Sequence, residues 1–214
     1  MTDSSPPTLS LSQRKRADIM AACIAEFRAH GFAGGRIERI AERAGVSKRT
    51  LYKHFSSKNA MFDAIAANAV MPLPRNSAPS FDPACPIAEQ LTALLTQYMG
   101  VIATDEYVTV SRILVAEFIA DPARSKGVSS RETMAAGPIE NMMMQAMAAG
   151  LLRNADPIYA AAQLTGMLKT FFFWPRFLTG AEPLDEIEGR AIIDDAIAMF
   201  LSHYAPSSQF FKEG

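Results

Sequence analysis

Side chains that can donate hydrogen bonds to an anion gather in one short segment that follows Gly45. Between Ser47 and His54 the chain carries hydroxyl, guanidinium and ammonium groups, while Leu51 and Phe55 are apolar. At helical spacing these two apolar residues share one face, so the polar side chains project from the other. Guanidinium and ammonium groups bind phosphates and the acceptor atoms of guanine, and hydroxyls bind phosphates. The segment therefore predicts a short helix that is suited to the major groove of DNA.

The sequence contains no comparable grouping for catalysis or metal binding. Its histidines, His30, His54 and His203, are scattered, and Cys23 and Cys85 have no spacing typical of a metal site. No paired carboxylates stand out, and no Ser or Cys nucleophile has an evident base. We therefore expect no enzymatic activity and no cofactor, with an all-helical enzyme as the alternative from another class.

The net charge of the chain is −1, but charge is distributed unevenly along it. Residues 1–60 carry eleven basic and five acidic residues, a net charge of +6, and the rest carries ten basic and seventeen acidic ones, a net charge of −7. This asymmetry favours contact between the first module and a polyanion, with chance fluctuation as the alternative. No apolar run could span a bilayer and residues 1–10 lack a signal-peptide pattern, so we expect a cytoplasmic protein without membrane contact.

Helices must position the polar segment, because apolar residues recur at three- and four-residue steps and no stretch alternates like a strand. We therefore predict an all-α fold. Helices are expected over residues 12–30, 36–44, 47–54 and from 57 to beyond 69, then over 87–103, 105–120, 129–150 (disturbed by Pro138), 157–177 (capped by Asp156) and 184–204.

These helices predict a three-helix head and a larger helical body. The expected boundaries are a disordered tail at 1–11, a helix-turn-helix domain at 12–56, a regulatory and dimerisation domain at 57–205, and a tail at 206–214. The helix that begins at residue 57 connects the two domains, and a loop rich in Pro and Ser follows it at about 71–86.

The turn between the second and third helices has the arrangement of a helix-turn-helix. Ala41 lets two helices approach closely, Gly45 can take the positive φ that the tight turn needs, and Val46 and Leu51 fill the angle between the helices. This region resembles the N-terminal signature of the TetR family of repressors. The matching residues are Ile19-Met-Ala-Ala22, Phe27, Gly31-Phe32, Ile40-Ala41, Ala44-Gly-Val-Ser47, Leu51-Tyr52, His54-Phe55 and Ser57-Lys58. A looser similarity, which includes Ala160-Ala-Ala-Gln-Leu-Thr-Gly166, links the body to the AefR-like branch.

The resemblance implies an all-helical homodimer with a DNA-binding head and a ligand-binding body. Residues implied to lie near base edges or flanking phosphates are Ser47, Lys48, Arg49, Thr50 and Lys53. Residues implied to anchor the DNA backbone are Tyr52, His54 and Lys58. The alternative for each is a solvated helix face, and for His54 it is packing inside the head beside Phe55.

One departure from the family pattern is Gly34-Gly35-Arg36, which stands where the family has a Thr or Ser that caps the second helix and touches a phosphate. Glycine tolerates the N-cap conformation but has no hydroxyl. We therefore predict that Arg36 reaches the phosphate instead, so that Arg36→Ala weakens binding to all DNA sequences alike.

The last two predicted helices combine small and large apolar residues, which suggests a dimer seam built as a four-helix bundle. The residues expected in this seam are Ile158, Ala162, Thr165, Ile197, Leu201 and Tyr204. The alternative is that both helices pack only inside their own subunit.

Methionine and aromatic residues are concentrated between the head and this seam, and they suit an adaptable pocket for an apolar or aromatic effector. The residues expected to line it are Met143, Met147, Phe171 and Trp174, with Tyr107, Arg112 and Glu117 as polar contacts. Core packing is the alternative, because consecutive residues of a helix point in different directions.

Together these features predict a ligand-responsive repressor that binds a palindromic operator as a homodimer and is released by its effector. In this mechanism the effector binds better when the heads are too far apart for adjacent major grooves, so that DNA and effector oppose each other. A second possibility keeps the DNA-binding head but gives the body a protein partner instead of a small molecule.

Overall fold

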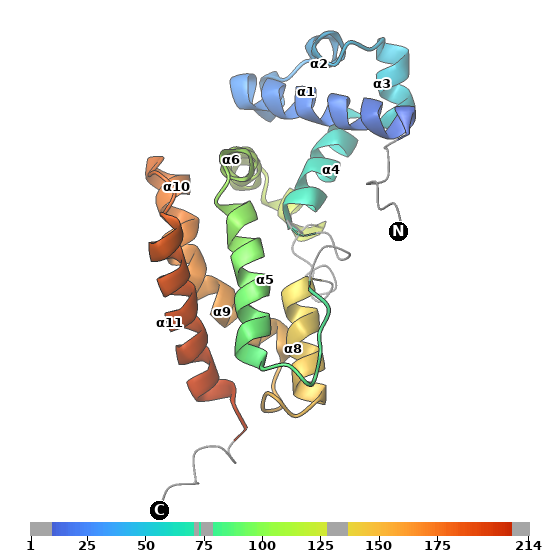
Figure 1. The fold of residues 1–214 in the computed structure, drawn as a ribbon. Helices are drawn as coiled ribbons and strands as arrows, with labels where there is room; N and C mark the ends of the chain where they lie inside the picture. Colours follow the sequence, from blue (N-terminus) through green and yellow to red (C-terminus); the bar gives the residue numbers. More distant parts are fainter. Residues whose placement is uncertain (1–9, 71–72, 74–78, 128–136, 207–214) are drawn as a thin grey trace, which may run out of the picture.

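The computed structural model of the protein describes residues 10–70, 73, 79–127 and 137–206. Its head consists of α1 (Leu11–Gly34), α2 (Ile37–Arg43) and α3 (Lys48–His54), and α4 (Lys58–Val70) leads from the head into the body (Figure 1). Within these described ranges the chain forms helices and no strand, which confirms the predicted all-α fold.

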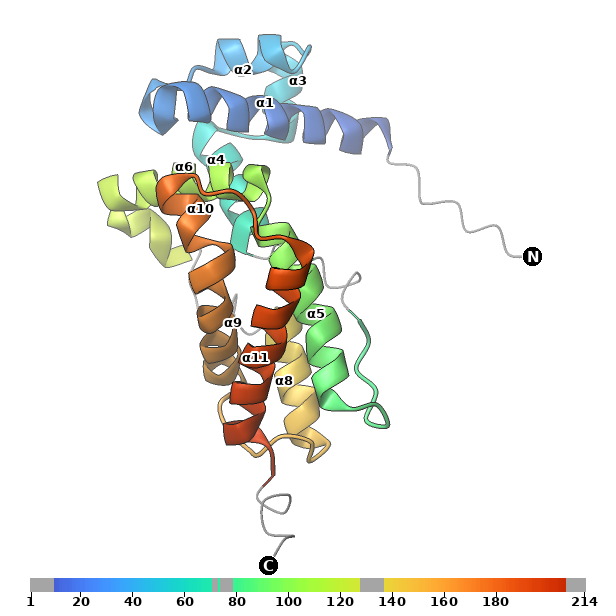
Figure 2. The same cartoon turned by 60° about the vertical axis from the view of Figure 1, so that its left-hand side comes forward.

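The body contains the remaining helices. They are α5 (Ile87–Ile102), α6 (Asp105–Ala120), the 3-10 helix η2 (Pro122–Gly127), α8 (Pro138–Ala148), α9 (Pro157–Phe172), α10 (Trp174–Thr179) and α11 (Glu186–Tyr204). Helices α5, α8, α9 and α11 form an upright bundle, and α6 lies across the upper end of it, beneath the head (Figure 1, Figure 2).

The first helix begins at a capping box and is interrupted by a glycine. The backbone N–H of Gln13 donates to the Ser10 hydroxyl (3.2 Å), and the Ser10 N–H donates back to the Gln13 side chain (2.8 Å). Gly31 has a φ of +67°, a conformation that residues with a Cβ adopt only at a cost. The regular helix therefore breaks where the sequence predicts its end, and one further turn runs to Gly34.

The head packs against α6 through a shared apolar core. Side chains from α1 to α4 form one apolar cluster, and Val110 and Leu114 of α6 belong to the same cluster, at 7% and 4% exposure. Burying an apolar side chain of this size contributes roughly 1.5–3 kcal/mol. A second cluster fills the bundle of α5, α8, α9 and α11. Through Val110 and Leu114, α6 therefore shares one core with the head.

Two helix boundaries in the body differ from the prediction. The helix predicted over 157–177 is two helices, because the backbone leaves the regular spiral at Phe173 and Pro175 stands in the first turn of α10, where it needs no N–H partner. In the described part of the helix predicted over 129–150, α8 begins at Pro138, which starts the helix instead of disturbing it; residues 129–136 lie outside the described ranges. By contrast, Asp156 caps α9 as predicted, since its carboxylate accepts the N–H of Ile158 at 3.0 Å.

Candidate nucleic-acid interface

A tight turn at Gly45 sets the angle between α2 and α3. Gly45 has a φ of +62°, its N–H donates to the Glu42 carbonyl (3.1 Å), and the Val46 N–H donates to the Ala41 carbonyl (3.0 Å). Ser47 then caps α3 by accepting the Thr50 N–H at 3.1 Å. The backbone thus turns at the position that the sequence predicts, and the cap begins the next helix two residues later.

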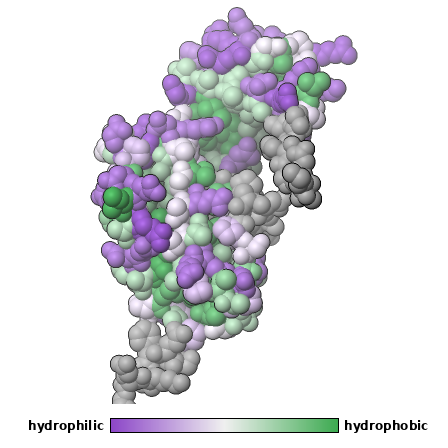
Figure 3. All heavy atoms as spheres, in the orientation of Figure 1, coloured by the Kyte–Doolittle hydropathy of each residue, from purple (hydrophilic) through white to green (hydrophobic). Residues whose placement is uncertain are grey.

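Helix α3 packs on the head through one face and leaves the other face open. Leu51 and Phe55 are buried at 0% and 3% exposure, whereas Lys48, Arg49 and Lys53 are exposed. Hydrophilic side chains cover much of the head's outer surface (Figure 3). This arrangement matches the two-faced helix that the spacing of the apolar residues predicts.

Three of the predicted contact residues are free of internal partners. The side chains of Arg49, Tyr52 and Lys53 are exposed and form no hydrogen bond or ion pair with another residue of the described chain. Their donors are available to an external acceptor without any internal bond being broken. Tyr52 keeps half of its surface exposed.

Lys48 is held by an acid of the neighbouring helix. Its ammonium donates to Glu38 Oε1 at 2.5 Å, and this hydrogen bond is the main cause that lowers the pKa of the Glu38 carboxyl from its usual range. Both side chains are more than half exposed, and ion pairs between such groups are weak because water screens them. Lys48 can therefore exchange Glu38 for a phosphate at low cost.

The hydroxyl of Ser47, the N-cap residue of α3, interacts with that of Thr50. Ser47 Oγ and Thr50 Oγ1 lie 3.0 Å apart, and Ser47 also accepts the Thr50 N–H. Ser47 is thus first of all the cap that begins the helix. Thr50 is half-buried, unlike its neighbours Lys48 and Arg49.

The end of α3 is fixed by an arginine of α1. Arg16 donates to the carbonyl of His54 (3.2 Å), and its guanidinium lies 4.2 Å from the centre of the Phe55 ring. The His54 side chain is half-buried, so its exposure lies between that of a DNA-backbone anchor and that of a residue packed inside the head. Arg16 of α1 therefore holds the C-terminal end of α3 in place.

The start of α2 depends on a buried acid that the sequence did not single out. Arg36 is the N-cap residue of α2, and its side chain is exposed and makes no capping bond. Its backbone N–H donates instead to Glu26 Oε1 (3.0 Å), and Arg39 donates to the same oxygen at 2.7 Å. The sequence feature that could have identified Glu26 as a buried acid is its place on the apolar face of α1, three residues after Cys23.

Lys58 supports the turn between α1 and α2. Its ammonium donates to the carbonyls of Phe32 (2.8 Å), Ala33 (3.2 Å) and Gly35 (3.1 Å) and lies 4.6 Å from the centre of the Phe32 ring. An ammonium has three N–H donors, and these three carbonyls engage all of them. The arrangement therefore favours a structural role for Lys58 over the phosphate contact that the resemblance implies.

The residues expected in the dimer seam do not share one surface. Thr165, Ile197 and Tyr204 are buried within the protomer, and the Tyr204 hydroxyl donates to the Gln163 side chain at 2.5 Å. Leu201 and Ile158 are half-buried, and Ala162 is exposed. These three buried residues pack inside their own subunit, which was the alternative to a dimer seam. They do so because α9 and α11 face each other through their larger apolar residues.

The residues expected to bind an effector are likewise not gathered around one cavity. Met143 is fully buried in the body core and Met147 packs against it, while Phe171 and Trp174 are about half exposed. The polar residues have internal partners. Tyr107 donates to the Ala69 carbonyl (3.1 Å), Arg112 donates to the carbonyls of Phe177 (2.9 Å) and Arg176 (2.8 Å), and Glu117 pairs with Arg124 (3.2 Å).

Other kinds of site find little support in the described part of the chain. No three of its His, Cys, Asp or Glu residues come together in a way that could hold a metal ion. None of its helices combines the length and the apolar character needed to cross a membrane.

Comparison with known proteins agrees with this architecture. Residues 19–65 match the family model described as bacterial regulatory proteins, tetR family, and residues 89–206 match the C-terminal domain of AefR-like transcriptional repressors. The first match runs from within α1 to within α4 and includes the turn at Gly45, and the second covers most of the body.

Individual proteins point the same way. The chain is 33% identical to a TetR family transcriptional regulator from Pseudomonas syringae pv. tomato, with a TM-score of 0.73 over 91% of this chain and 99% of that one. It is 25% identical to the flavonoid-responsive regulator FrrA, with a TM-score of 0.70 over 91% of this chain and 98% of that one. It is 36% identical to the HTH-type transcriptional repressor SCO4008 of Streptomyces coelicolor over 58 residues, which are 27% of this chain and 30% of that relative.

These matches join the head and the body of the chain to one group of proteins, whose members are transcriptional regulators and not enzymes. The chain belongs to the TetR family of bacterial transcriptional regulators and carries a helix-turn-helix head and an AefR-like C-terminal domain.

Proposed function

We propose that the protein is a repressor that binds a palindromic operator as a homodimer and is released by a small apolar or aromatic effector. The observation that carries the proposal is the open face of α3, where Arg49 and Lys53 have exposed donors that no other described residue accepts. One short helix covers only a few base pairs. Two heads related by a two-fold axis would read half-sites about 34–36 Å apart, which is one turn of DNA.

Roles within the head follow from the position of each side chain. Arg49 is assigned to a base edge, because guanidinium groups bind guanine with two hydrogen bonds. Lys48, Tyr52 and Lys53 are assigned to phosphates. Arg36 is exposed at the start of α2, where a helix N-terminus attracts anions, and it takes the place of the hydroxyl that the family has there.

Dimerisation is assigned to the outer faces of α9 and α11. Small and apolar residues are exposed there although their neighbours are buried: Tyr159 keeps 60% of its surface exposed, Met199 keeps 63%, and Ala162 is exposed one turn after Tyr159. Large exposed apolar residues on adjacent helices are typical of a surface that a partner covers. A second copy of the chain suits this surface because a palindromic site requires a two-fold symmetric reader.

The operator can be identified by selecting genomic DNA fragments with the purified full-length chain at low ionic strength. We expect one enriched two-fold symmetric motif and, for Arg49→Ala, a loss of affinity for it of about 5- to 150-fold, equivalent to 1–3 kcal/mol. Arg190→Ala is the control, since Arg190 pairs with Asp194 on α11 at 2.8 Å, far from the head along the chain. If the chain retains no DNA even in dilute buffer, the proposal is wrong.

The effector is assigned to an apolar or aromatic class, with support from the apolar body and from the relative named as flavonoid-responsive. An effector that binds the DNA-free form better must weaken DNA binding, and DNA weakens effector binding by the same factor. The competing hypothesis gives the body a protein partner. Adding cell-free small-molecule extract to the operator complex separates the two, because only a small effector passes a dialysis membrane and still releases the DNA.

A further inference from the structure

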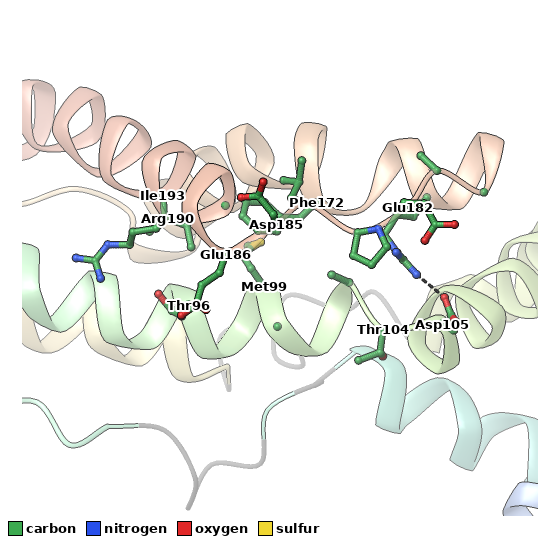
Figure 4. Close-up of a pocket in the computed structure, with 18 residues that line it drawn as sticks. Thr96, Met99, Thr104, Asp105, Phe172, Glu182, Asp185, Glu186, Arg190 and Ile193 are labelled. Atoms are coloured by element: carbon green, nitrogen blue, oxygen red, sulfur yellow. Dashed lines mark hydrogen bonds and ion pairs between the residues drawn. The ribbon is translucent and has the colours of Figure 1, made fainter.

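A cavity of about 730 Å³ opens in the body between α5, the start of α6 and the start of α11 (Figure 4). Met99, Phe172 and Ile193 supply apolar wall, and the loop between α10 and α11 forms one rim. Gly189 lets α11 approach the aromatic wall closely, since a Cβ at this position would lie 3.3 Å from the Phe172 ring. The cavity contains none of the seven residues that the sequence predicted for effector binding.

One residue that lines the cavity has N–H groups that form no hydrogen bond with any described residue. Arg176 is 8% exposed, and its Nη2 donates to the carboxylate of Asp105, at the first position of α6. The Nε and Nη1 atoms of the same guanidinium are buried and lack a hydrogen-bond partner among the described residues. A buried N–H without an acceptor destabilises the protein. Because Arg176 lines the cavity, a small turn of its side chain would bring these enclosed donors to an oxygen placed there, which would regain the lost hydrogen bonds.

The charges around the cavity define which kind of oxygen is missing. Asp105 already neutralises Arg176, and Arg190 is paired with Asp194. Three further acids line the cavity, namely Glu182, Asp185 and Glu186. The site therefore lacks a hydrogen-bond acceptor but not a negative charge, and an anion would meet a surplus of carboxylates.

We propose that this cavity binds an uncharged apolar molecule whose carbonyl oxygen accepts a hydrogen bond from Arg176. The inference rests on the proposed ligand response of the body and specifies the site and chemistry of that response. The apolar part of the molecule lies against Met99, Phe172 and Ile193, and the carbonyl reaches the unused edge of the guanidinium. Shape alone would admit many hydrocarbons, so the buried donors provide the selectivity.

The site is connected to the head through α6. Arg176 bonds to the first residue of this helix, and Arg112 in its middle donates to the carbonyls of Arg176 and Phe177 in α10. Further along α6, Val110 and Leu114 lie in the core of the head. A ligand that changes the bonds of Arg176 therefore acts on the helix that carries the head.

Three probes of nearly equal shape test the ligand class. They are 4-phenylbutan-2-one, which has the carbonyl; butylbenzene, which lacks it; and 3-phenylpropanoate, which replaces the ketone methyl by a charged oxygen. With the full-length protein in calorimetric or ligand-detected NMR titrations, we expect the ketone to bind about tenfold more tightly than either of the others, the amount that one hydrogen bond to a charged donor supplies.

Two variants test the role assigned to Arg176. Arg176→Lys keeps the ion pair with Asp105 but removes the Nε and Nη1 donors and leaves N–H groups only at the Asp105 end of the side chain, and we expect the ketone to lose its tenfold advantage over butylbenzene. Asp105→Asn leaves the guanidinium without a counter-charge, and the carboxylate of Asp105 is 95% exposed, so the fold should tolerate the change. In this variant the preference should invert, with 3-phenylpropanoate binding more tightly than the ketone.

Two further variants test the location. A Cβ at Gly100 would meet no atom within 4 Å, so Gly100→Leu should fold normally and fill the cavity, and ketone binding should fall at least tenfold. Arg153→Gln is the matched control, because Arg153 also donates to a carbonyl, that of His203, but at the opposite end of α11. Its ketone affinity should equal that of the unmodified protein.

Operator binding, measured with the same preparations, separates this inference from the proposed function. If DNA binds but the ketone does not, or binds no better than butylbenzene, the assignment of the cavity is wrong while the repressor proposal stands. Tighter binding of 3-phenylpropanoate to the unmodified protein would overturn the requirement for an uncharged ligand. If the ketone binds as expected but DNA is ignored, the proposed function fails and the cavity assignment survives.

Discussion

Glu26 is the residue on which the geometry of the head depends most directly. Its carboxylate is completely buried, yet it accepts hydrogen bonds from the Arg39 side chain and from the Arg36 backbone. These bonds, with Arg39 as the larger contribution, hold the pKa of Glu26 below its usual value of 4.5 despite burial. Glu26 thus satisfies a backbone donor at the start of α2 for which the N-cap residue offers no side-chain acceptor.

This arrangement predicts how acid affects the head. Because the pKa of Glu26 is lower in the folded state, its stabilising contribution is complete above the unfolded value near 4.5 and is lost as the pH falls through the folded value. Glu26→Gln should reduce the free energy of unfolding at pH 7 by roughly 1.5–3 kcal/mol, the range for hydrogen bonds to charged groups. Urea unfolding at pH 7 and at acid pH measures both effects.

The variant should also lose less stability on acidification than the unmodified protein. Glu42→Gln, on the exposed side of α2, is the control and should leave stability at pH 7 within about 0.5 kcal/mol. An acid dependence that is identical in the unmodified protein and in Glu26→Gln would show that Glu26 does not carry this contribution.

At the scale of elements, the turn between α2 and α3 requires a glycine because of its backbone conformation, and not because a side chain would clash there. Gly45 has a φ of +62°, and a Cβ there would meet no atom within 4 Å. Gly45→Ala should therefore cost about 1–2 kcal/mol of conformational strain without any clash. Because the strain is relieved by reorienting α3, operator affinity should fall as well, which thermal unfolding and fluorescence anisotropy can measure together.

Gly100→Ala is the matched comparison, since a Cβ there also meets open space but the backbone is helical. Replacing this glycine should stabilise the protein by about 0.5–1 kcal/mol and leave DNA binding unchanged. Equal effects of the two substitutions would contradict the role of positive φ at Gly45.

Elements that depend on local signals are the ones that the sequence predicts well. Asp156 begins α9, Ser47 begins α3 and Gly45 ends the helix before it, because each acts through the backbone of its own few residues. The break at Phe173 also has a local signal, since Pro175 stands in the first turn of α10 and cannot continue a helix, but the sequence prediction carried one helix across it. The ion pair of Arg176 with Asp105 and the bond of Glu26 to Arg36 were missed for another reason, since no local pattern records partners that lie 71 and 10 residues away.

At the scale of the whole molecule, opposite charges are separated between head and body. The head region carries a net charge of +6 and the rest −7, and the acids Glu26 and Glu38 of the head are already engaged by Arg39 and Lys48. Contact with DNA then releases counterions in proportion to the phosphates that are neutralised. A dimer with six or more phosphate contacts should lose about a thousandfold or more in affinity between 50 and 200 mM salt.

Lys53→Ala should make this salt dependence shallower. The ammonium of Lys53 has no partner among the described residues, so its removal should lower the slope of log affinity against log salt by about one unit for each protomer. A titration of operator binding at several salt concentrations measures the slope. An unchanged slope with reduced affinity would mean that Lys53 contacts a base or supports the fold instead.

The proposed dimer seam on α9 and α11 would bring two heads together. Ala162 is exposed on α9, one turn after Tyr159, and a small residue at this position lets a partner helix approach closely. Ala162→Glu would place a charged side chain there and should convert the dimer into monomers that remain folded, as light scattering and circular dichroism would report. Each head then binds alone, so affinity for the palindrome should fall at least a hundredfold, while affinity for one half-site stays the same.

Ala120→Glu places the same charge on an exposed alanine at the end of α6, outside the proposed seam, and should leave the dimer intact. The two variants differ only in position, so a difference between them reports on the seam and not on added charge. If Ala162→Glu stays dimeric and binds the palindrome normally, α9 does not form the interface. In that case the exposed aromatic residues at the end of α9 and the start of α10, Phe171 and Trp174, would be the next surface to test.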